Sequence, residues 1–240
     1  MRLVAGLAVF ALTVLFSLSA LATAFSVAPV TVHVPPPGRT AIITVKNHGE
    51  TAAAIQIRPF SWQQRDGEDV LSPTPDVVAS PPIANVLPGA VQTVRIVRIG
   101  TDDAADEAPY RLIVDEIPDT QNQQSGTVKV FLRYSIPVFF AAQNADRSDV
   151  TWQLNDTSPI SLTLHNRGHG HLRIADLRLI TPEGSEVSLR KGLVGYVLGG
   201  SSITWTFNKT LSPGTMQGIR VAGKSQHGSF DAAIDGRASR

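Results

Sequence analysis

The chain has 240 residues, of which 42% are hydrophobic and 17% are charged, with 21 basic and 20 acidic side chains. This balance gives no electrostatic case for nucleic acid or an anionic membrane as a partner, because both require concentrated positive charge. There is no cysteine, which excludes disulfides and thiol chemistry and leaves stability to burial and hydrogen bonding.

The N-terminus has the pattern of a secretory signal. Met1-Arg2 is followed by a run without charge that ends in Ala22-Thr23-Ala24, the small-x-small pattern of a cleavage site. We expect a signal peptide over residues 1–24, a mature chain beginning at Phe25 and a periplasmic location. The alternative is an uncleaved N-terminal anchor. Charges or prolines interrupt every later apolar run, so we expect no membrane insertion after signal removal.

Strand patterns dominate the first half of the mature chain. Alternating or β-branched segments are predicted over residues 41–47, 53–60, 91–99, 110–117 and 127–140. Proline and glycine punctuate the chain, and no window of similar length has convincing helical spacing. Alternation puts one face of each strand on a core, so the pattern predicts an all-β protein built as a β-sandwich.

A polar stretch at residues 140–149 divides the chain just past its middle and lacks strand alternation. Shorter strands are predicted beyond it, over 151–154, 160–165, 171–180, 186–189, 202–208 and 218–221. The last residues, 224–240, are polar, and we expect part of this stretch to be disordered. The pattern predicts two sandwiches in tandem, over residues 25–142 and 148–240.

Three histidines lie close together, at His165, His169 and His171. Imidazole is a common metal ligand. However, Asn166 and the glycines between the histidines are typical of a turn, Arg167 would repel a cation, and no acidic residue or cysteine is adjacent. We predict a solvent-exposed hairpin turn and no metal site. The alternative is a periplasmic metal-binding module.

Carboxylates cluster at Asp102-Asp103, at Asp106-Glu107 and at Asp115-Glu116. The first two clusters are typical of a solvated loop between strands, and the two members of the third are strand neighbours that point to opposite faces. No serine is framed as Gly-x-Ser-x-Gly, no histidine is placed for a triad, and no glycine loop is suited to phosphate. The sequence predicts no catalytic residue, no cofactor and no enzyme activity.

Five motifs follow one another between residues 79 and 139: Ala79-Ser80-Pro81-Pro82-Ile83-Ala84, Leu87-Pro88-Gly89, Val94-Arg95-Ile96, Tyr-Arg-Leu-Ile-Val-Asp-Glu-Ile-Pro at 110–118 and Arg-Tyr-Ser-Ile-Pro-Val-Phe at 133–139. Their order and spacing resemble the N-terminal domain of periplasmic pilus chaperones of the chaperone-usher pathway, specifically the archaic branch that assembles Csu-type and spore-coat-like pili. The resemblance implies two tandem immunoglobulin-like domains. It also implies a protein that folds and caps pilus subunits and delivers them to an outer-membrane usher, without nucleotide or metal.

Chaperones of this kind lend a β-strand to a client sandwich that lacks one. Main-chain hydrogen bonds form along the open edge while alternate side chains fill the groove. By motif position the donor segment is 127–134, and Val128, Val130 and Leu132 would fill the groove, each contributing about 1.5–3 kcal/mol when fully buried. Alternatively, these three side chains face the protein's own core, which would leave Phe131 exposed between two cations.

The resemblance also implies a basic residue that binds the client's C-terminal carboxylate between the domains. The better-known branch uses an Arg on the first strand and a Lys near the end of the donor strand, but residues 26–34 contain neither and Pro137 replaces the Lys. The best match is Arg111, because a guanidinium holds a carboxylate through two parallel hydrogen bonds. Arg133 and Arg95 are further candidates. The alternative for Arg111 is a structural salt bridge to Asp115.

Two questions stay open in the sequence. Related chaperones have a cis bond at the place of Ser80-Pro81, whereas trans is the default for a bond before proline. A rival function is a structural pilus component made of two sandwiches, which would need a detachable N-terminal extension with alternating apolar residues. Residues 25–34 do alternate, with a proline among them. The ordered motifs favour the chaperone.

Overall fold

The structure is a computed structural model that describes residues 25–100, 106–118, 130–142, 149–155, 159–209, 218–234 and 236–237. The expected signal peptide over 1–24 lies outside these residues, as do Asp102-Asp103 and Val128. Within the described residues the chain forms strands, and no helix there is long and apolar enough to cross a membrane.

The first sandwich, called the N-terminal sandwich here, is built from two sheets with the orders β1-β3-β8-β6 and β2-β10-β9-β4-β5, the second carrying β7 on β4. Its strands are β1 (Phe25–Ala28), β2 (Val32–Val34), β3 (Thr40–Asn47), β4 (Ala53–Arg65), β5 (Glu68–Pro73), β6 (Val77–Ser80), β7 (Ile83–Val86), β8 (Val91–Arg98), β9 (Ala108–Ile117) and β10 (Arg133–Phe140).

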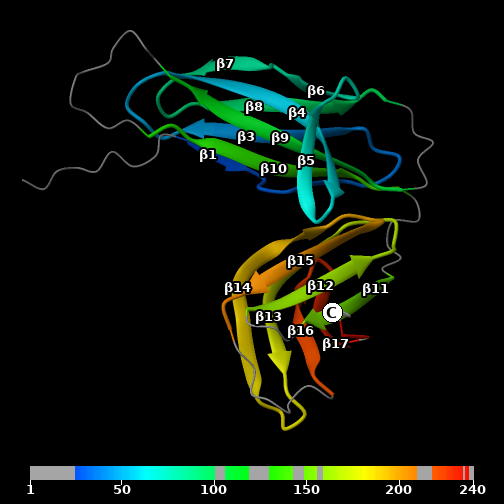
Figure 1. The fold of residues 1–240 in the computed structure, drawn as a ribbon. Coiled ribbons are helices and arrows are strands. Elements are labelled where there is room, and N and C mark those ends of the chain that lie inside the picture. Colours follow the sequence, from blue (N-terminus) through cyan, green and yellow to red (C-terminus); the bar gives the residue numbers. More distant parts are fainter. Residues whose placement is uncertain are drawn as a thin grey trace, which may run out of the picture.

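The C-terminal sandwich has two sheets with the orders β15-β12-β11-β18 and β14-β13-β16-β17. Its strands are β11 (Val150–Asn155), β12 (Ile160–Asn166), β13 (Leu172–Ile180), β14 (Glu186–Val197), β15 (Ser201–Phe207), β16 (Arg220–Ser225), β17 (Gly228–Ala233) and β18 (Gly236–Arg237). Figure 1 shows the two sandwiches as separate bodies, with the β4–β5 hairpin reaching from the first toward the second.

Each sandwich has its own apolar core, as strand alternation predicts. In the N-terminal sandwich the inward residues of β3 and β8, such as Ile43 and Val94, are fully buried against the opposite sheet. In the C-terminal sandwich Trp152 lies in the core, and Phe230 stacks on it with ring centres 5.7 Å apart. The predicted all-β fold with two sandwiches is confirmed.

The elements extend beyond those expected in two places. Strand β4 runs on to Arg65 and forms a hairpin with β5 through Asp66-Gly67, both with positive φ. Strand β5 gives no signal in the sequence, because it is exposed along almost its whole length and therefore shows no alternation. The polar stretch after residue 224 is also a hairpin, since Phe230 and its alternate neighbours pack against the core.

The segment between β6 and β7 carries the chain from one sheet of the N-terminal sandwich to the other. Strand β6 pairs with β8, whereas β7 pairs with β4. The Ser80-Pro81 bond between them is cis, as are Ala28-Pro29 and Pro36-Pro37. The Pro82 carbonyl accepts the Ile57 N–H at 2.8 Å, which ties the crossing segment to β4. The isomer left open by the sequence is therefore cis.

The same asparagine turn closes a strand in both sandwiches. Asn47 is fully buried, its Nδ2 donates to the carbonyls of Thr51 and Val86 at 2.8 and 2.9 Å, and its Oδ1 accepts the Gly49 N–H at 2.8 Å. Asn166 repeats this pattern in the C-terminal sandwich. Each side chain therefore satisfies two main-chain groups of its turn and one carbonyl at the end of another strand.

Replacing Asn47 by alanine is expected to destabilise the protein by roughly 1–3 kcal/mol, because buried main-chain groups lose their partners. Urea unfolding measures the change. Asn85→Ala, at an exposed position on β7, is the control and should leave the midpoint nearly unchanged. Equal midpoints for Asn47→Ala and wild type would show that the turn does not depend on these bonds.

Candidate functional site

Strand β10 faces two different apolar environments. Its even-numbered residues Tyr134, Ile136, Val138 and Phe140 pack on the core of the N-terminal sandwich. Phe139 points the other way and forms a separate buried cluster with Trp62, Tyr196 and Leu198, two of which come from the C-terminal sandwich. The strand thus takes part in both the core and the contact between the sandwiches.

The outer edge of β10 is only partly paired. Strand β9 pairs with it from Arg133 to Phe140, but on the other side β2 pairs only with its last three residues, in parallel. Within the described residues, no strand pairs with this edge between Arg133 and Pro137. The Ala141 N–H donates to Val34, so odd-numbered residues direct their main-chain groups to this edge. Pro137, which has no N–H, is tolerated there.

The residues just before β10 are apolar and largely uncovered. Val130 is 75% exposed and Phe131 is 42% exposed, while Leu132 is half-buried and its carbonyl accepts the Glu116 N–H at 3.1 Å. The alternative that Val130 faces the protein's own core is therefore wrong. Val130 and Leu132 share the parity of the core-facing residues of β10 but precede the strand and are not buried. They form an apolar extension of that face.

Arg111 lies on β9, opposite Pro137 of β10, at the contact between the sandwiches. Its guanidinium carbon is 3.7 Å from the centre of the Trp62 ring and 5.6 Å from that of Tyr196. Its side chain is only 14% exposed, and the ion pair that it forms within the described part of the chain, to Asp69, is long at 3.5 Å. Burial lowers the pKa of Arg111, and the opposing effects of Asp69 and Tyr196 do not restore it.

The alternative salt bridge between Arg111 and Asp115 is wrong. Asp115 binds Arg58 at 2.7 Å and Arg133 at 2.5 Å, on the part of β9 farther from the C-terminal sandwich. Burial alone would raise the pKa of Asp115, but hydrogen bonds from Arg133 and Arg58 bring it below its usual value. Arg133 is therefore engaged by Asp115, although its side chain is 67% exposed.

Arg95 lies apart from the other two candidates. It is exposed on β8, in the sheet opposite the one that holds β9 and β10. The structure therefore brings Arg111 alone, of the three, into the contact with Tyr196 of the C-terminal sandwich.

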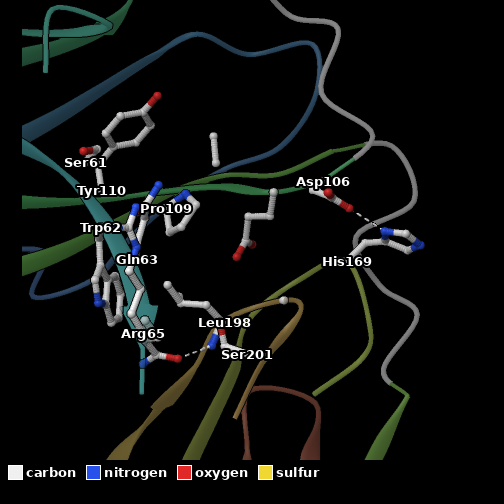
Figure 2. Close-up of a pocket in the computed structure, with 14 residues that line it drawn as sticks. Ser61, Trp62, Gln63, Arg65, Asp106, Pro109, Tyr110, His169, Leu198 and Ser201 are labelled. Carbon is white, nitrogen blue, oxygen red and sulfur yellow. Dashed lines mark hydrogen bonds and ion pairs between the residues drawn. The ribbon is translucent and has the colours of Figure 1, made fainter. Parts of the chain in front are cut away.

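A cleft of about 530 Å³ opens between the sandwiches and is shown in Figure 2. Gln64 spans it: its Nε2 donates to the Tyr196 carbonyl and its Oε1 accepts the Leu198 N–H, both at 2.9 Å. On the other side His169 pairs with Asp106 at 2.5 Å. Trp62, the partner of Arg111, lines the cleft. The sequence analysis missed Trp62 and Gln64, because nothing near them in the chain marks an interdomain surface.

The predicted exposed histidine turn is only partly correct. His169 is 49% exposed, but the His171 side chain is only 6% exposed because it pairs with Glu107 at 2.8 Å. The Glu107 side chain is 4% exposed, so the solvated loop predicted around it is wrong for this residue. Glu107 and His171 are 64 positions apart, and adjacency in the sequence gave no signal for the pair.

Residues 24–145 match the family described as pili and flagellar-assembly chaperone, PapD N-terminal domain, which is about half of the chain. The protein belongs to this family. The matched region contains all five ordered motifs, so the family resemblance seen in the sequence is confirmed. A search of the curated proteins found no match.

Solved structures of pilus chaperones share the fold. The chaperone in the CsuC–CsuE chaperone-tip adhesion subunit pre-assembly complex of Acinetobacter baumannii superposes with a TM-score of 0.69 at 23% identity, over 90% of this chain and 100% of that one. The CupB2 chaperone of Pseudomonas aeruginosa gives 0.60 at 19% identity, over 87% and 100%. The Salmonella enterica complex of SafA pilin with the SafB chaperone gives 0.60 at 16% identity, over 88% and 96%. The pilus chaperone described here has their two-domain architecture.

Proposed function

We propose that this pilus-assembly chaperone works in the periplasm by strand donation and belongs to the archaic branch. It binds, folds and caps pilus subunits and delivers them to an outer-membrane usher. Two of the similar structures support the choice of partner, because each is a complex of a chaperone with a pilus subunit. The CsuC–CsuE structure is described as coming from archaic Csu pili, which supports the branch.

The observation that carries strand donation is the uncovered apolar extension beside a free sheet edge. Val130 is 75% exposed, although residues of the same parity on β10, such as Ile136 and Val138, are buried in the core. A client sandwich that lacks a strand has unpaired edges and an open groove. Residues 127–134 would pair with those edges, while Val128, Val130 and Leu132 would enter the groove. The cores of the two proteins would then be continuous, since the groove residues share the parity of Ile136 and Val138.

Arg111 is the anchor we propose for the client's terminal carboxylate. It is held on the faces of Trp62 and Tyr196, which fixes the guanidinium plane, and its only ion pair among the described residues is the 3.5 Å contact to a half-exposed Asp69. A desolvated guanidinium with one weak carboxylate contact gains most from a second carboxylate that binds with two hydrogen bonds. Arg133 is a poorer anchor because Asp115 already binds it at 2.5 Å.

The remaining parts of the proposal come from the sequence and the family. A signal peptide over residues 1–24 would direct the chain to the periplasm, and the division at 25–142 and 148–240 assigns one sandwich to each domain. The rival, a structural pilus component, is not favoured. Its detachable extension would include residues 25–34, and β1 and β2 in this range are paired with β3 and β10.

Hydrogen exchange of the chaperone with a co-expressed pilus subunit tests strand donation directly. In the complex, amides of residues 130–136 should exchange more slowly than in the free protein, because the client strand covers the free edge. Peptides of the β16–β17 hairpin, far from this edge, are the internal control and should not change. A complex that protects other segments and leaves 130–136 unchanged would refute strand donation from β10.

A further inference from the structure

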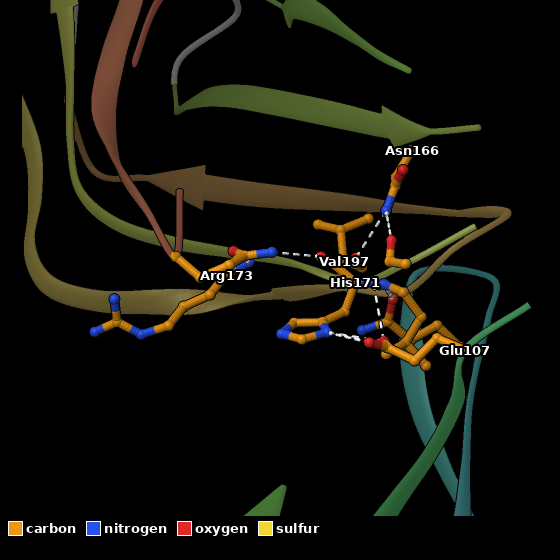
Figure 3. Close-up of polar contacts among 9 residues, drawn as sticks. Glu107, Asn166, His171, Arg173 and Val197 are labelled. Carbon is orange, nitrogen blue, oxygen red and sulfur yellow. Dashed lines mark hydrogen bonds and ion pairs between the residues drawn. The ribbon is translucent and has the colours of Figure 1, made fainter. Parts of the chain in front are cut away.

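Three metal-ligating side chains meet where the two sandwiches touch: His33, Glu107 and His171. Their ligand atoms all lie within 4.8 Å of one another. His33 comes from β2 and Glu107 from the residue before β9, both in the N-terminal sandwich, whereas His171 directly precedes β13 in the C-terminal sandwich. Figure 3 shows Glu107 approaching His171 across the contact.

Glu107 and His171 are held in fixed positions. The His171 Nδ1 lies 2.8 and 3.0 Å from the two Glu107 carboxylate oxygens, and the His171 main-chain N–H donates to the same carboxylate at 3.0 Å. The His171 ring also stacks on Phe139, with centres 3.5 Å apart and an angle of 6°. The Glu107 carboxylate and the His171 ring are therefore held side by side, and a cation bound by both would displace the proton that they share to solvent.

His33 supplies the third ligand and a route of entry. It is exposed on β2, and the parallel pairing of β2 with β10 sets it beside Phe139. Its ring centre is 5.9 Å from that of His171, at 54°. Since its side chain is on the solvent side, it can rotate toward the other two ligands, and water can occupy a fourth position.

We propose that His33, Glu107 and His171 form a zinc site that joins the two sandwiches. Two imidazoles and one carboxylate are a ligand set that suits Zn²⁺, and the fourth position of its tetrahedron is often a water. At ligand distances of about 2.0–2.1 Å, tetrahedral ligand atoms are about 3.3 Å apart. The ligand atoms lie within 4.8 Å of one another, so none has to approach another by more than about 1.5 Å to reach that spacing.

The proposed zinc site involves side chains between the two sandwiches that have no role in strand donation. Phe139 forms an apolar wall against the inner histidine, which limits water on that side. Because the ligands come from both sandwiches, a bound ion would restrict the angle between them. This inference is independent of the donor strand and of Arg111.

Zinc titration of the untagged, chelator-treated protein by calorimetry tests the site. Wild type should bind one zinc per chain, and His33→Ala should weaken the affinity by at least about tenfold, since it removes a direct ligand. His227→Ala removes an exposed histidine of the β16–β17 turn and should bind zinc as wild type does. His33 is exposed, so its replacement should not disturb the fold, which thermal melting will verify.

Cobalt(II) gives a second readout. Wild type should show the intense visible absorption of a tetrahedral nitrogen and oxygen site, and Glu107→Gln should lose it. The proposal is overturned if wild type binds no zinc, or if His33→Ala and His227→Ala bind it equally well.

Discussion

Replacing Val130 by aspartate is expected to abolish capture of a pilus subunit while leaving the free chaperone as stable as wild type. Val130 is 75% exposed in the free protein, so a carboxylate there remains hydrated. In the complex the same side chain would enter the client's groove. It would lose about 1.5–3 kcal/mol of apolar burial and also leave a carboxylate without a partner. Together these effects predict an affinity weaker by at least about 100-fold.

The measurement is co-purification with the subunit, followed by titration of the separated proteins. Val91→Asp is a matched control, because Val91 is 56% exposed on β8 in the opposite sheet. Unfolding midpoints of both variants should equal that of wild type. If Val130→Asp retains the subunit as well as Val91→Asp does, this side chain does not enter a client.

Replacing Arg111 by alanine is expected to weaken subunit binding by about 2–5 kcal/mol, or roughly 30-fold or more, because the client's carboxylate loses a desolvated charged partner. Arg111→Lys should recover only part of the affinity, since an ammonium cannot form the two parallel bonds of a guanidinium. The dissociation rate of the subunit is the measurement, because the loss of a buried charged contact acts mainly on dissociation.

Arg111 also stacks on Trp62, so the variant needs a control for packing. Arg111→Met keeps an apolar stem on the Trp62 ring and removes the charge, and it should bind as weakly as the alanine variant. Arg95→Ala and Arg133→Ala test the other two candidates and should have small effects. An effect of either variant larger than that of Arg111→Ala would move the anchor to that residue.

Most strands are predictable because burial of one face in the core produces an alternation of apolar and polar residues within each segment. Segments such as 41–47 and 91–99 alternate because one face is buried, and the structure has β3 and β8 there. Strand β5 is exposed along most of its length, so nothing in its own residues distinguishes it from a loop. Its place is set by pairing with β4, which is information that a single segment does not contain.

The site is less predictable, because it depends on contacts between residues far apart in the chain. The motif around Arg111 is recognisable by resemblance, but its contacts with Trp62 of β4 and with Tyr196 of the C-terminal sandwich join residues far apart in the chain. The histidine turn was recognisable from Asn166 and its glycines. The burial of His171 was not, since its carboxylate comes from the other sandwich.

If the chaperone donates a strand and Arg111 is the anchor, the pairing of Pro137 with Arg111 would set the direction and length of the client strand. The two residues lie opposite each other in the β9–β10 register. Because Pro137 has no N–H, the free edge of β10 has no main-chain donor at the level of Arg111, the proposed carboxylate anchor. A client chain that ends there and follows the edge back to Val130 must run parallel to β10 over residues 130–136, about 23 Å of extended chain. One additional residue would turn every client side chain to the opposite face. Under strand donation, the chaperone would therefore select its clients by the length of their last strand.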